Sequence, residues 1–273
     1  MSKIVNVSKY IKKFGLRWTT SMIINRILRK LGILSDIGLI KEEIFLDSLS
    51  TLKGEVALGP FKGMKISEKS WWGKDDILNK LLGQYEIHIL EKIIELSRKY
   101  DHFIDIGAAD GYYPVGLLVS KHFKECSCFE ISEKGRSVIY ENGKINKISD
   151  KLEIHKEANA QSIREILNRK GPSLILCDIE GAEFSLFDEA LLSSISNSEI
   201  IIELHDWLFN DEDRPIDNLI LRAKKFFTVE YLIRKSPEIY YCEYFNDWSD
   251  NKRMLAFSET RPKKMDWILL TPK

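Results

Sequence analysis

An acidic residue and two glycines follow one another at the end of an apolar run. The run Phe103–Ile106 predicts a buried strand that contains Asp105, and Gly107 and Gly111 bound the loop that follows. Glycine permits backbone conformations and close ligand approach that a side chain would block. The Gly-x-x-x-Gly spacing differs from the Gly-x-Gly-x-x-Gly of dinucleotide sites. A carboxylate here would repel a pyrophosphate, but it could accept hydrogen bonds from a cationic amino group, such as the one in a methionine moiety.

A second carboxylate stands at the end of the next predicted strand, Ser127–Glu130. Glu130 follows Gly107 at about the 20-residue separation at which an acid commonly holds the ribose hydroxyls of a nucleoside. Several adenosine-containing cofactors are bound in this way, so the pattern predicts nucleoside binding without identifying the cofactor. Considered without the glycine loop, Glu130 would be interpreted as an ordinary surface acid.

Three acids close together follow a third apolar run, Leu174–Asp178. They are Asp178, Glu180 and Glu183, and Gly181 bends the chain between them. Ligands of open α/β sheets bind beyond the carboxyl ends of the strands, so Asp178 and Glu180 are expected at the mouth of a binding site. Glu183 could instead be a first-turn acid of the next helix, stabilised by the helix dipole.

A glutamate and a histidine stand two positions apart at the end of the predicted strand Ile200–Leu204. Glu203 and His205 are therefore expected to point to the same side of the sheet. The histidine could take a proton from an attacking hydroxyl because its ordinary pKa is about 6.5. A structural histidine is the alternative. With Asp178, the same two side chains could also hold a divalent cation, although their spacing is not specific to a metal.

Short apolar strands alternate with helical segments from residue 103 onward. This alternation predicts an α/β fold with a mostly parallel sheet covered by helices on both faces. The predicted strands are Phe103–Ile106, Ser127–Glu130, Leu152–Lys156, Leu174–Asp178, Ile200–Leu204, Thr228–Ile233 and Trp267–Leu270. The predicted helices are Asp75–Lys99, Pro114–His122, Glu133–Asn146, Gln161–Asn168, Glu183–Leu192 and Pro215–Phe226.

The sequence predicts two parts, an N-terminal helical and irregular extension over residues 1–75 and an α/β domain over residues 76–273. The first 35 residues contain lysines and arginines but no acid before Asp36, and apolar residues recur at intervals of three to four positions. That pattern predicts short amphipathic helices with a basic outer face. They could pack on the main domain. Contact with an anionic membrane surface or a partner protein is the alternative.

The composition is that of an ordinary globular protein. Hydrophobic residues make up 44% of the 273 residues, which is enough for a sizeable core. The 41 basic and 41 acidic residues cancel, so the net charge does not favour a nucleic-acid partner. The four scattered cysteines are interpreted as reduced, which predicts a cytoplasmic protein without disulfides. We recognise no signal peptide, and no apolar run is long enough to span a bilayer.

Together, these motifs make the sequence similar to the FkbM family of class I methyltransferases. The resemblance covers roughly residues 80–270 and rests on three segments. They are Asp105-Ile-Gly-Ala-Ala-Asp-Gly-Tyr-Tyr113, Asp178-Ile-Glu-Gly-Ala-Glu183 and Ile202-Glu-Leu-His205. The second segment is the most specific. Upstream, Leu82-Gly-Gln-Tyr-Glu86 resembles the segment that precedes the core in bacterial members, and we expect it to close over the cofactor.

The resemblance implies a Rossmann-like class I methyltransferase fold with a seven-stranded sheet whose last strands form an antiparallel hairpin. It implies S-adenosylmethionine as cofactor and O-methylation of a hydroxyl on a sugar, a glycan or a small natural product. The implied cofactor-binding residues are Tyr85, Glu86, Asp105, Gly107, Ala108, Ala109, Asp110, Gly111, Tyr112, Tyr113, Glu130, Ala158, Asn159 and Asp178. The implied catalytic residues are Asp178, Glu180 and His205.

The resemblance also implies a place along the cofactor for several of these residues. Asp105, Gly107 and Gly111 would lie along the methionine part, Glu130 on the ribose, and Ala158 and Asn159 near the adenine. One position departs from the family pattern. Asp110 stands where members often have Asn, and it adds a negative charge beside the cofactor.

Other functions fit parts of the sequence less well. An NAD-dependent oxidoreductase would need the dinucleotide loop that is missing. A non-catalytic binding module would be expected to have lost the acids at the strand ends. A nucleic-acid methyltransferase is disfavoured by the neutral charge and by the lack of an Asn-Pro-Pro-Tyr-type element after the fourth strand. The acceptor stays unidentified, and segments that could face it are residues 1–80, Trp207–Arg214 and Tyr240–Trp248. The aromatic residues of these segments could equally pack as a cover over the sheet.

Overall fold

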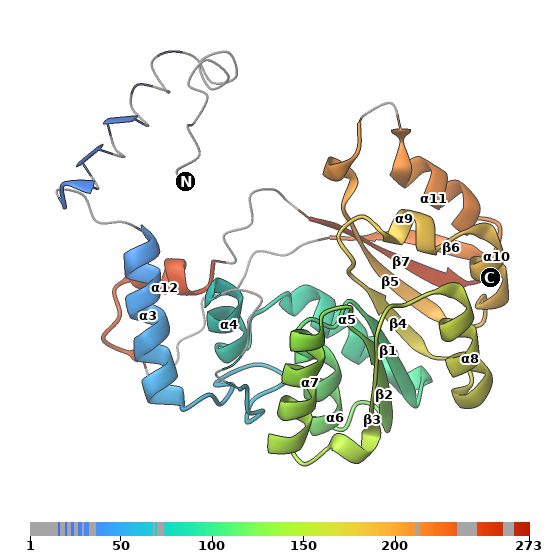
Figure 1. Ribbon diagram of the computed structural model, residues 1–273, viewed down its shortest axis with the longest axis horizontal. Helices are drawn as coiled ribbons and strands as arrows, with labels where there is room; N and C mark the ends of the chain where they lie inside the picture. The colour runs from blue at the N-terminus through green and yellow to red at the C-terminus, as the bar shows by residue number, and fades with distance from the viewer. Residues whose placement is uncertain are drawn as a thin grey trace.

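Seven strands form one sheet in the order β3-β2-β1-β4-β5-β7-β6 (Figure 1). The computed structural model describes residues 16, 20, 23, 24, 27, 28, 30–32, 37–67, 69, 74–210, 213–233, 245–258 and 265–273. The strands are β1 (His102–Ile106), β2 (Glu125–Phe129), β3 (Leu152–His155), β4 (Leu174–Cys177), β5 (Glu199–Leu204), β6 (Phe227–Leu232) and β7 (Asp266–Pro272). β1 to β5 run parallel, and β7 is antiparallel to both β5 and β6. The predicted fold class, a Rossmann-like α/β fold with a seven-stranded, mostly parallel sheet and a C-terminal antiparallel pair, is confirmed.

Helices cover both faces of the sheet (Figure 1). Helices α5 (Ile87–Leu96), α6 (Tyr112–Val119) and α7 (Glu133–Ile145) cover one face. The other face carries α8 (Ala160–Lys170), α9 (Glu183–Leu186), α10 (Glu189–Ser194) and α11 (Pro215–Ala223). Helices α3 (Ile37–Leu52), α4 (Lys74–Leu81) and α12 (Asp250–Ala256) lie together beside the first face. Short 3-10 turns are η1 (Ser97–Lys99), η2 (Ser149–Lys151) and η3 (Asp206–Leu208).

The central strands are apolar on both faces because each face packs against helices. Successive residues of β1 illustrate this, since Phe103 belongs to the core under α5 and α6 while Ile104 belongs to the core under α8 and α10. All five residues of β1 and all six of β5 are buried. The parallel register places the carboxyl ends of β1, β2, β4 and β5 at one edge of the sheet, where ligands of such sheets bind.

The prediction of one helix over Asp75–Lys99 is wrong. Helix α4 ends at Leu81 and α5 begins at Ile87, because Gly83 adopts a φ of 68° between them. A Cβ on Gly83 would lie 1.9 Å from the carbonyl oxygen of Leu58, so only glycine fits this close approach. The predicted helix Glu183–Leu192 is likewise two helices, and the Asp188 side chain caps the second one.

The segment before residue 75 contributes to the main core as far as it is described. Val56, Phe61 and Met64 are buried in the same cluster as residues of α6 and of the sheet. Phe61 contacts α6 closely, since a Cβ on Gly116 would lie 2.3 Å from its ring. Described residues on both sides of the expected domain boundary therefore share one hydrophobic core. Most of the basic N-terminal helices predicted from the sequence lie outside the described residues.

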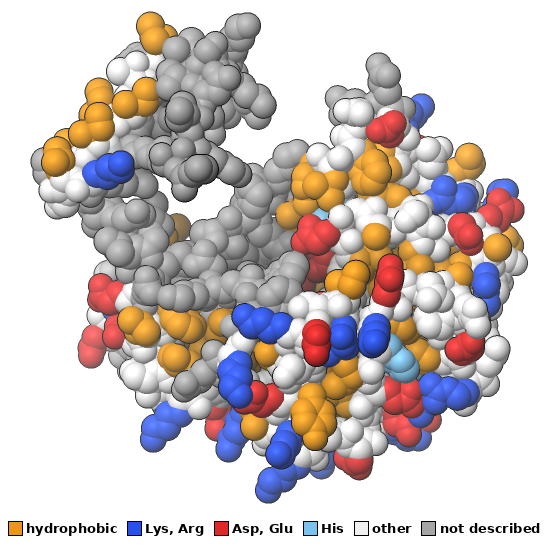
Figure 2. Space-filling view, viewed as in Figure 1, with side chains coloured by type: hydrophobic (Ala, Val, Ile, Leu, Met, Phe, Trp, Pro, Cys, Tyr) orange, Lys and Arg blue, Asp and Glu red, His pale blue; other side chains and the backbone are white. Residues whose placement is uncertain are grey.

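Charges of both signs are interspersed over the face shown in Figure 2, in agreement with the equal numbers of acidic and basic residues. A search of the described residues for a helix that is long and apolar enough to cross a membrane finds none.

The sequence left open whether the aromatic residues of the segments that could face the acceptor bind the acceptor or pack as a cover over the sheet. Phe245 is buried, and Trp248 stacks on it with the ring centroids 4.0 Å apart, so both pack as cover over the core. Trp71, Trp72, Tyr240 and Tyr241 lie outside the described residues.

Candidate functional site

A cavity of about 310 Å³ opens beyond the carboxyl ends of β1, β2 and β4. Most residues that the sequence singled out lie in its wall, and they come from five separate stretches of the chain. They are Tyr85, Asp105, Gly107, Ala108, Ala109, Asp110, Tyr112, Tyr113, Glu130, Ala158, Asp178 and Glu180. The fold therefore brings together motifs that are far apart in the sequence.

Three of the expected cofactor-binding residues do not line this cavity. Glu86 lies behind it, where its carboxylate accepts a hydrogen bond of 2.6 Å from the Tyr113 hydroxyl. Gly111 is the N-cap of α6 and has a φ of 79°. Asn159 caps α8 through a reciprocal pair of hydrogen bonds with Ser162. Each of these residues positions neighbouring elements of the wall instead of forming part of it.

The glycine loop is fixed between two strands. Gly107 and Ala108 both donate their backbone N–H groups to the carbonyl oxygen of Phe129, at 3.0 and 2.9 Å. Gly107 has a φ of 95°, and a Cβ there would lie 1.8 Å from the carbonyl oxygen of Asp178. A side chain at this position would therefore push the end of β4 away from the loop. Glycine is required here by close packing as well as by its backbone conformation.

Glu130 is held as a fork beside this loop. One carboxylate oxygen accepts a hydrogen bond of 2.9 Å from the Ala109 N–H, and the other accepts one of 2.7 Å from the Ser132 N–H. Each carboxylate oxygen can accept a further hydrogen bond. Gly135 makes room for this arrangement, since a Cβ there would lie 2.6 Å from the Glu130 side chain. The carboxylate is thus preorganised to accept bonds from a pair of hydroxyl groups.

The wall of the cavity carries an excess of negative charge. Six of its residues are acidic, and two, Lys80 and Lys156, are basic. Asp105 is buried among them, and its pKa is raised well above its ordinary range by burial and by the charges of Asp178, Glu130 and Asp110. Such a wall favours a cationic ligand and disfavours a polyphosphate.

Several residues of the wall were not predicted from the sequence. They are Lys80, Ile106, Phe129, Ile131, Ser132, Lys156, Glu157, Leu176, Ile179 and Ala182. Lys80 is the most important of these because its Nζ lies 2.8 and 2.9 Å from the two carboxylate oxygens of Asp110. It comes from α4, 30 positions before Asp110, and no motif marks it. The Lys80 side chain also lies over the ring of Tyr85, with Nζ 4.9 Å from the ring centroid.

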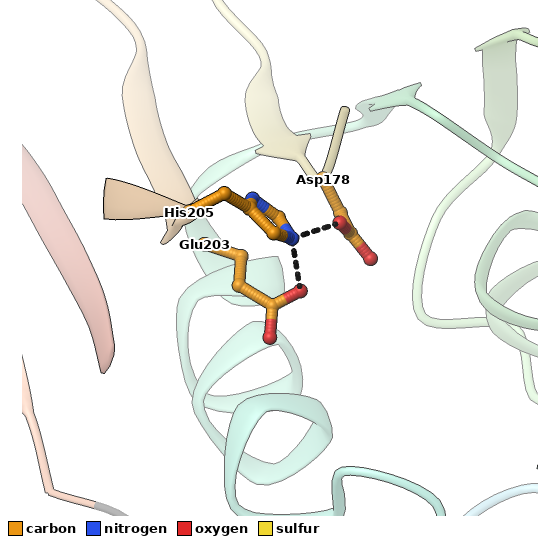
Figure 3. Close-up of side chains that lie close together, drawn as sticks. All are labelled: Asp178, Glu203 and His205. Carbon is orange, nitrogen blue, oxygen red and sulfur yellow. Dashed lines mark ion pairs between the residues drawn. The ribbon is translucent and has the colours of Figure 1, made fainter. Parts of the chain in front are cut away.

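A second cluster adjoins the cavity at the ends of β4 and β5 (Figure 3). The Nε2 atom of His205 lies 3.4 Å from Asp178 and 3.5 Å from Glu203. Glu180, which reaches the same atom at 3.6 Å, adopts a φ of 51°. The prediction that Glu203 and His205 face the same side agrees with this arrangement. Three acids, two from the segment after β4 and one from β5, thus meet at one imidazole nitrogen.

Glu183 holds the other side of this imidazole. One of its carboxylate oxygens accepts a hydrogen bond of 2.9 Å from the His205 backbone N–H and lies 3.2 Å from Nδ1. The other oxygen accepts a hydrogen bond of 2.8 Å from the Gly181 N–H. Because a carboxylate only accepts hydrogen bonds, Nδ1 is assigned the proton, and Nε2 then faces Asp178 and Glu203. Glu183 is therefore more than a first-turn acid of its helix.

Buried charge shifts the pKa values in this cluster. Burial raises the pKa of Asp178 to about 6. Burial, together with the charge of Asp178, raises the pKa of Glu203 far above its ordinary range. The two carboxyl groups hydrogen-bond to each other and share a proton, which Glu203 carries. Burial lowers the pKa of His205, but the hydrogen bond to Glu183 and the charge of Asp178 outweigh it, so the net shift is upward.

The same cluster has the composition of a metal site. Asp178, Glu203 and His205 each offer a ligand atom, and these atoms lie within 4.8 Å of one another. Glu183 orients the imidazole by the kind of hydrogen bond that supports histidine ligands in metalloproteins. The cluster can therefore act in two ways, as a proton-transfer site or as a holder for a divalent cation.

Comparison with known proteins identifies no family for this chain. No family model and no curated protein matches it. A similar solved structure is that of a Streptococcus pneumoniae protein provisionally assigned as a tRNA (m1A22) methyltransferase. It is 16% identical over 67% of this chain and 69% of that chain, with a TM-score of 0.45.

Two further solved structures resemble the chain to a similar degree. TrmK, the m1A22 tRNA methyltransferase of B. subtilis, is 11% identical over 67% of this chain and 64% of its own, with a TM-score of 0.44. A Klebsiella pneumoniae protein provisionally assigned as an O-methyltransferase is 12% identical over 92% and 96%, with a TM-score of 0.42. At these identities and TM-scores, the similarities assign neither an activity nor a substrate to this chain.

Proposed function

We propose that this protein is an S-adenosylmethionine-dependent methyltransferase that methylates a hydroxyl of a sugar, a glycan or a small natural product. The observation that carries the proposal is the acidic cavity beside the glycine loop, with Glu130 fixed as a fork in its wall. The cluster of Asp178, Glu180 and His205 adjoins that cavity and supplies the groups for the acceptor.

The charges of the cavity suit this cofactor. S-adenosylmethionine carries a positive sulfonium and a positive ammonium group, and the wall has six acidic residues against two basic ones. The pyrophosphate of NAD would meet the same carboxylates at an electrostatic cost. Glu130 keeps lone pairs free for two ribose hydroxyls, which supports a nucleoside at this position. The NAD-dependent oxidoreductase alternative is therefore disfavoured.

The chemistry asks mainly for alignment. When bound, S-adenosylmethionine supplies an activated methyl group on its sulfonium. The walls of the cavity exclude water and place the acceptor oxygen in line, which can lower the barrier by roughly 7–11 kcal/mol. His205 accepts the acceptor's proton at Nε2, because Glu183 keeps the other proton on Nδ1. Asp178, 3.4 Å from Nε2, stabilises the imidazolium that results.

A divalent cation is the alternative use of Asp178, Glu203 and His205. A cation there would orient neighbouring hydroxyls of a sugar and lower their pKa. A hydroxyl with a lowered pKa would lose its proton without the help of a histidine base. A non-catalytic module is disfavoured because the acids at the strand ends are present and converge on one nitrogen.

The proposal is tested by incubating the protein with methyl-labelled S-adenosylmethionine and a panel of sugars, glycans and hydroxylated natural products. We expect S-adenosylhomocysteine release with an acceptor, and a methyl group on its oxygen by mass spectrometry and NMR. Methylation of nitrogen or of tRNA would contradict the hydroxyl assignment. Parallel reactions with EDTA and with added Mg²⁺ separate the two uses of the cluster, since a histidine base needs no metal.

A further inference from the structure

The buried ion pair between Lys80 and Asp110 lies in the wall of the proposed cofactor cavity. Its two side chains are 3% and 2% exposed. A buried ion pair is often no more stabilising than apolar residues of similar size, because both charges lose their hydration. Stability alone is therefore a weak reason for this pair, and its position in a cavity wall suggests a part in ligand binding.

The hydrogen-bonding capacity of Lys80 is only partly used. Its ammonium has three N–H donors, and the carboxylate of Asp110 takes two of them. The rings of Tyr85 and Tyr112 stabilise the cation at 4.9 and 5.8 Å from their centroids. Among the residues that the structure describes, Nζ has no further hydrogen-bond acceptor. Tyr112, in the same wall, has a buried hydroxyl that also has no hydrogen-bond partner within that part of the chain.

An acidic side chain, that of Asp105, faces the same cavity as Lys80. The positive charge of Lys80 is close enough to lower the pKa of the Asp105 carboxyl group, which opposes the upward shift caused by burial and the neighbouring acids. The cavity thus presents a cation and a carboxyl group to one ligand, and a cationic ligand group would favour the ionised form of that carboxyl group. The head group of an α-amino acid carries a carboxylate and an ammonium on the same carbon, so it complements this pair of side chains.

We propose that Lys80 binds the carboxylate of the cofactor's methionine part, while Asp105 binds its ammonium and Asp110 holds Lys80 in position. This inference rests on the proposed function and names a specificity-determining residue for it. It also accounts for Asp110, whose charge is matched by Lys80. Lys80 comes from α4, so cofactor binding also involves the helical cover that precedes the sheet.

The inference is tested by comparing two ligands that differ in the head group. S-adenosylhomocysteine has the amino-acid head group, and 5′-methylthioadenosine has the same nucleoside and sulfur without it. Their dissociation constants are measured by calorimetry for the full chain and for the double variant Lys80→Met/Asp110→Asn. The double variant removes both buried charges, so it leaves no unpaired ion in the fold. Lys80→Arg, which keeps the charge, serves as the conservative variant.

We expect the double variant to bind S-adenosylhomocysteine roughly 10- to 100-fold more weakly, since a hydrogen-bonded charge is lost. Its affinity for 5′-methylthioadenosine should change less than about threefold, and Lys80→Arg should retain most of the discrimination between the ligands. Equal weakening of both ligands would make Lys80 a structural residue and overturn the inference, as would no weakening of either. If the unmodified chain binds neither ligand, the proposed function itself fails, which is a different result.

Discussion

Charge is arranged differently at one end of the cavity and in the cluster that adjoins its other end. At the end formed by α4 and the glycine loop, Lys80 and Asp110 match each other one to one. At the end formed by β4 and β5, the single imidazole of His205 is shared among Asp178, Glu180, Glu183 and Glu203. We call these the paired end (Lys80, Asp110) and the proton-sharing end (Asp178, Glu203, His205).

The difference separates binding from chemistry. The paired end holds one basic side chain against one acidic side chain, 2.8 Å apart and buried in the cavity wall. The proton-sharing end has more carboxylates than cations, so it must retain protons, and their positions shift readily between neighbouring groups. Substitutions at the first end should therefore alter affinity and stability, whereas substitutions at the second should alter turnover and its pH dependence.

The largest effect is expected for His205→Ala. Loss of the proton acceptor should lower kcat by about 10²–10⁴-fold. The dissociation constant of S-adenosylhomocysteine should stay within about threefold, since His205 lies outside the cavity wall. Stopped-time assays and calorimetry give both quantities. An unchanged kcat would show that His205 is not the proton acceptor. It would also contradict the assignment of binding to one end and of chemistry to the other.

The next largest effect is on stability at the paired end. Lys80→Met leaves Asp110 charged and buried without its partner, which should lower the free energy of unfolding by about 3–5 kcal/mol. Adding Asp110→Asn should recover most of this loss. Urea denaturation of the single and double variants measures the coupling. If the losses in free energy of unfolding caused by the two substitutions simply add in the double variant, the two ions do not stabilise each other.

Glu130→Ala should weaken S-adenosylhomocysteine binding by about 10–100-fold, because hydrogen bonds from ribose hydroxyls to a carboxylate are lost. The kcat at saturating cofactor should fall far less. Glu130→Gln is the matched control, since it keeps the shape and one acceptor oxygen. A variant that binds the ligand as tightly as the original chain would place the ribose elsewhere.

The pH dependence tests the role of Glu183 at the proton-sharing end. The neutral form of His205 accepts the proton, so kcat should fall as the pH drops through the histidine's raised pKa. Glu183→Gln removes a cause of that upward shift, so the acidic limb of the profile should move to lower pH. Glu189→Gln, which affects only a surface ion pair with Lys225, should leave the limb in place. If the acidic limb does not move in Glu183→Gln, then Glu183 does not control the proton transfer by His205.

The smallest effect is expected for Glu203→Gln. The carboxyl group already carries a proton, because its pKa is raised far above the ordinary range by burial and by Asp178. A neutral amide of the same shape should therefore change kcat by less than about threefold. A loss as large as that of His205→Ala, restored by added Mg²⁺, would instead support the divalent-cation alternative.

Sequence reasoning found the strands and most of the cavity wall because these depend on local patterns. The apolar runs before Asp105 and Asp178 predict strands, and parallel strands bring their carboxyl ends to one edge. The glycine loop and Glu130 are found in the same way. Glu203 and His205 follow from the alternation of side chains along β5.

The parts that were missed depend on tertiary contacts. The break between α4 and α5 depends on the approach of Gly83 to Leu58, 25 positions away in the chain, which no local pattern encodes. Lys80 looks like any solvent-facing lysine of a helix until Asp110 is placed beside it. The two bonds from Glu183 to His205 likewise need the fold, because they join the start of α9 to the end of β5.

The most direct test of the central claim is a parallel calorimetric titration of the protein with S-adenosylmethionine, S-adenosylhomocysteine and NAD. The account predicts micromolar binding of both adenosyl ligands, binding weakened by about 10–100-fold in Glu130→Ala, and no heat with NAD. Binding of NAD, or no binding of either adenosyl ligand, would contradict it. The fold would still stand in that case, and the acidic cavity would need a different ligand.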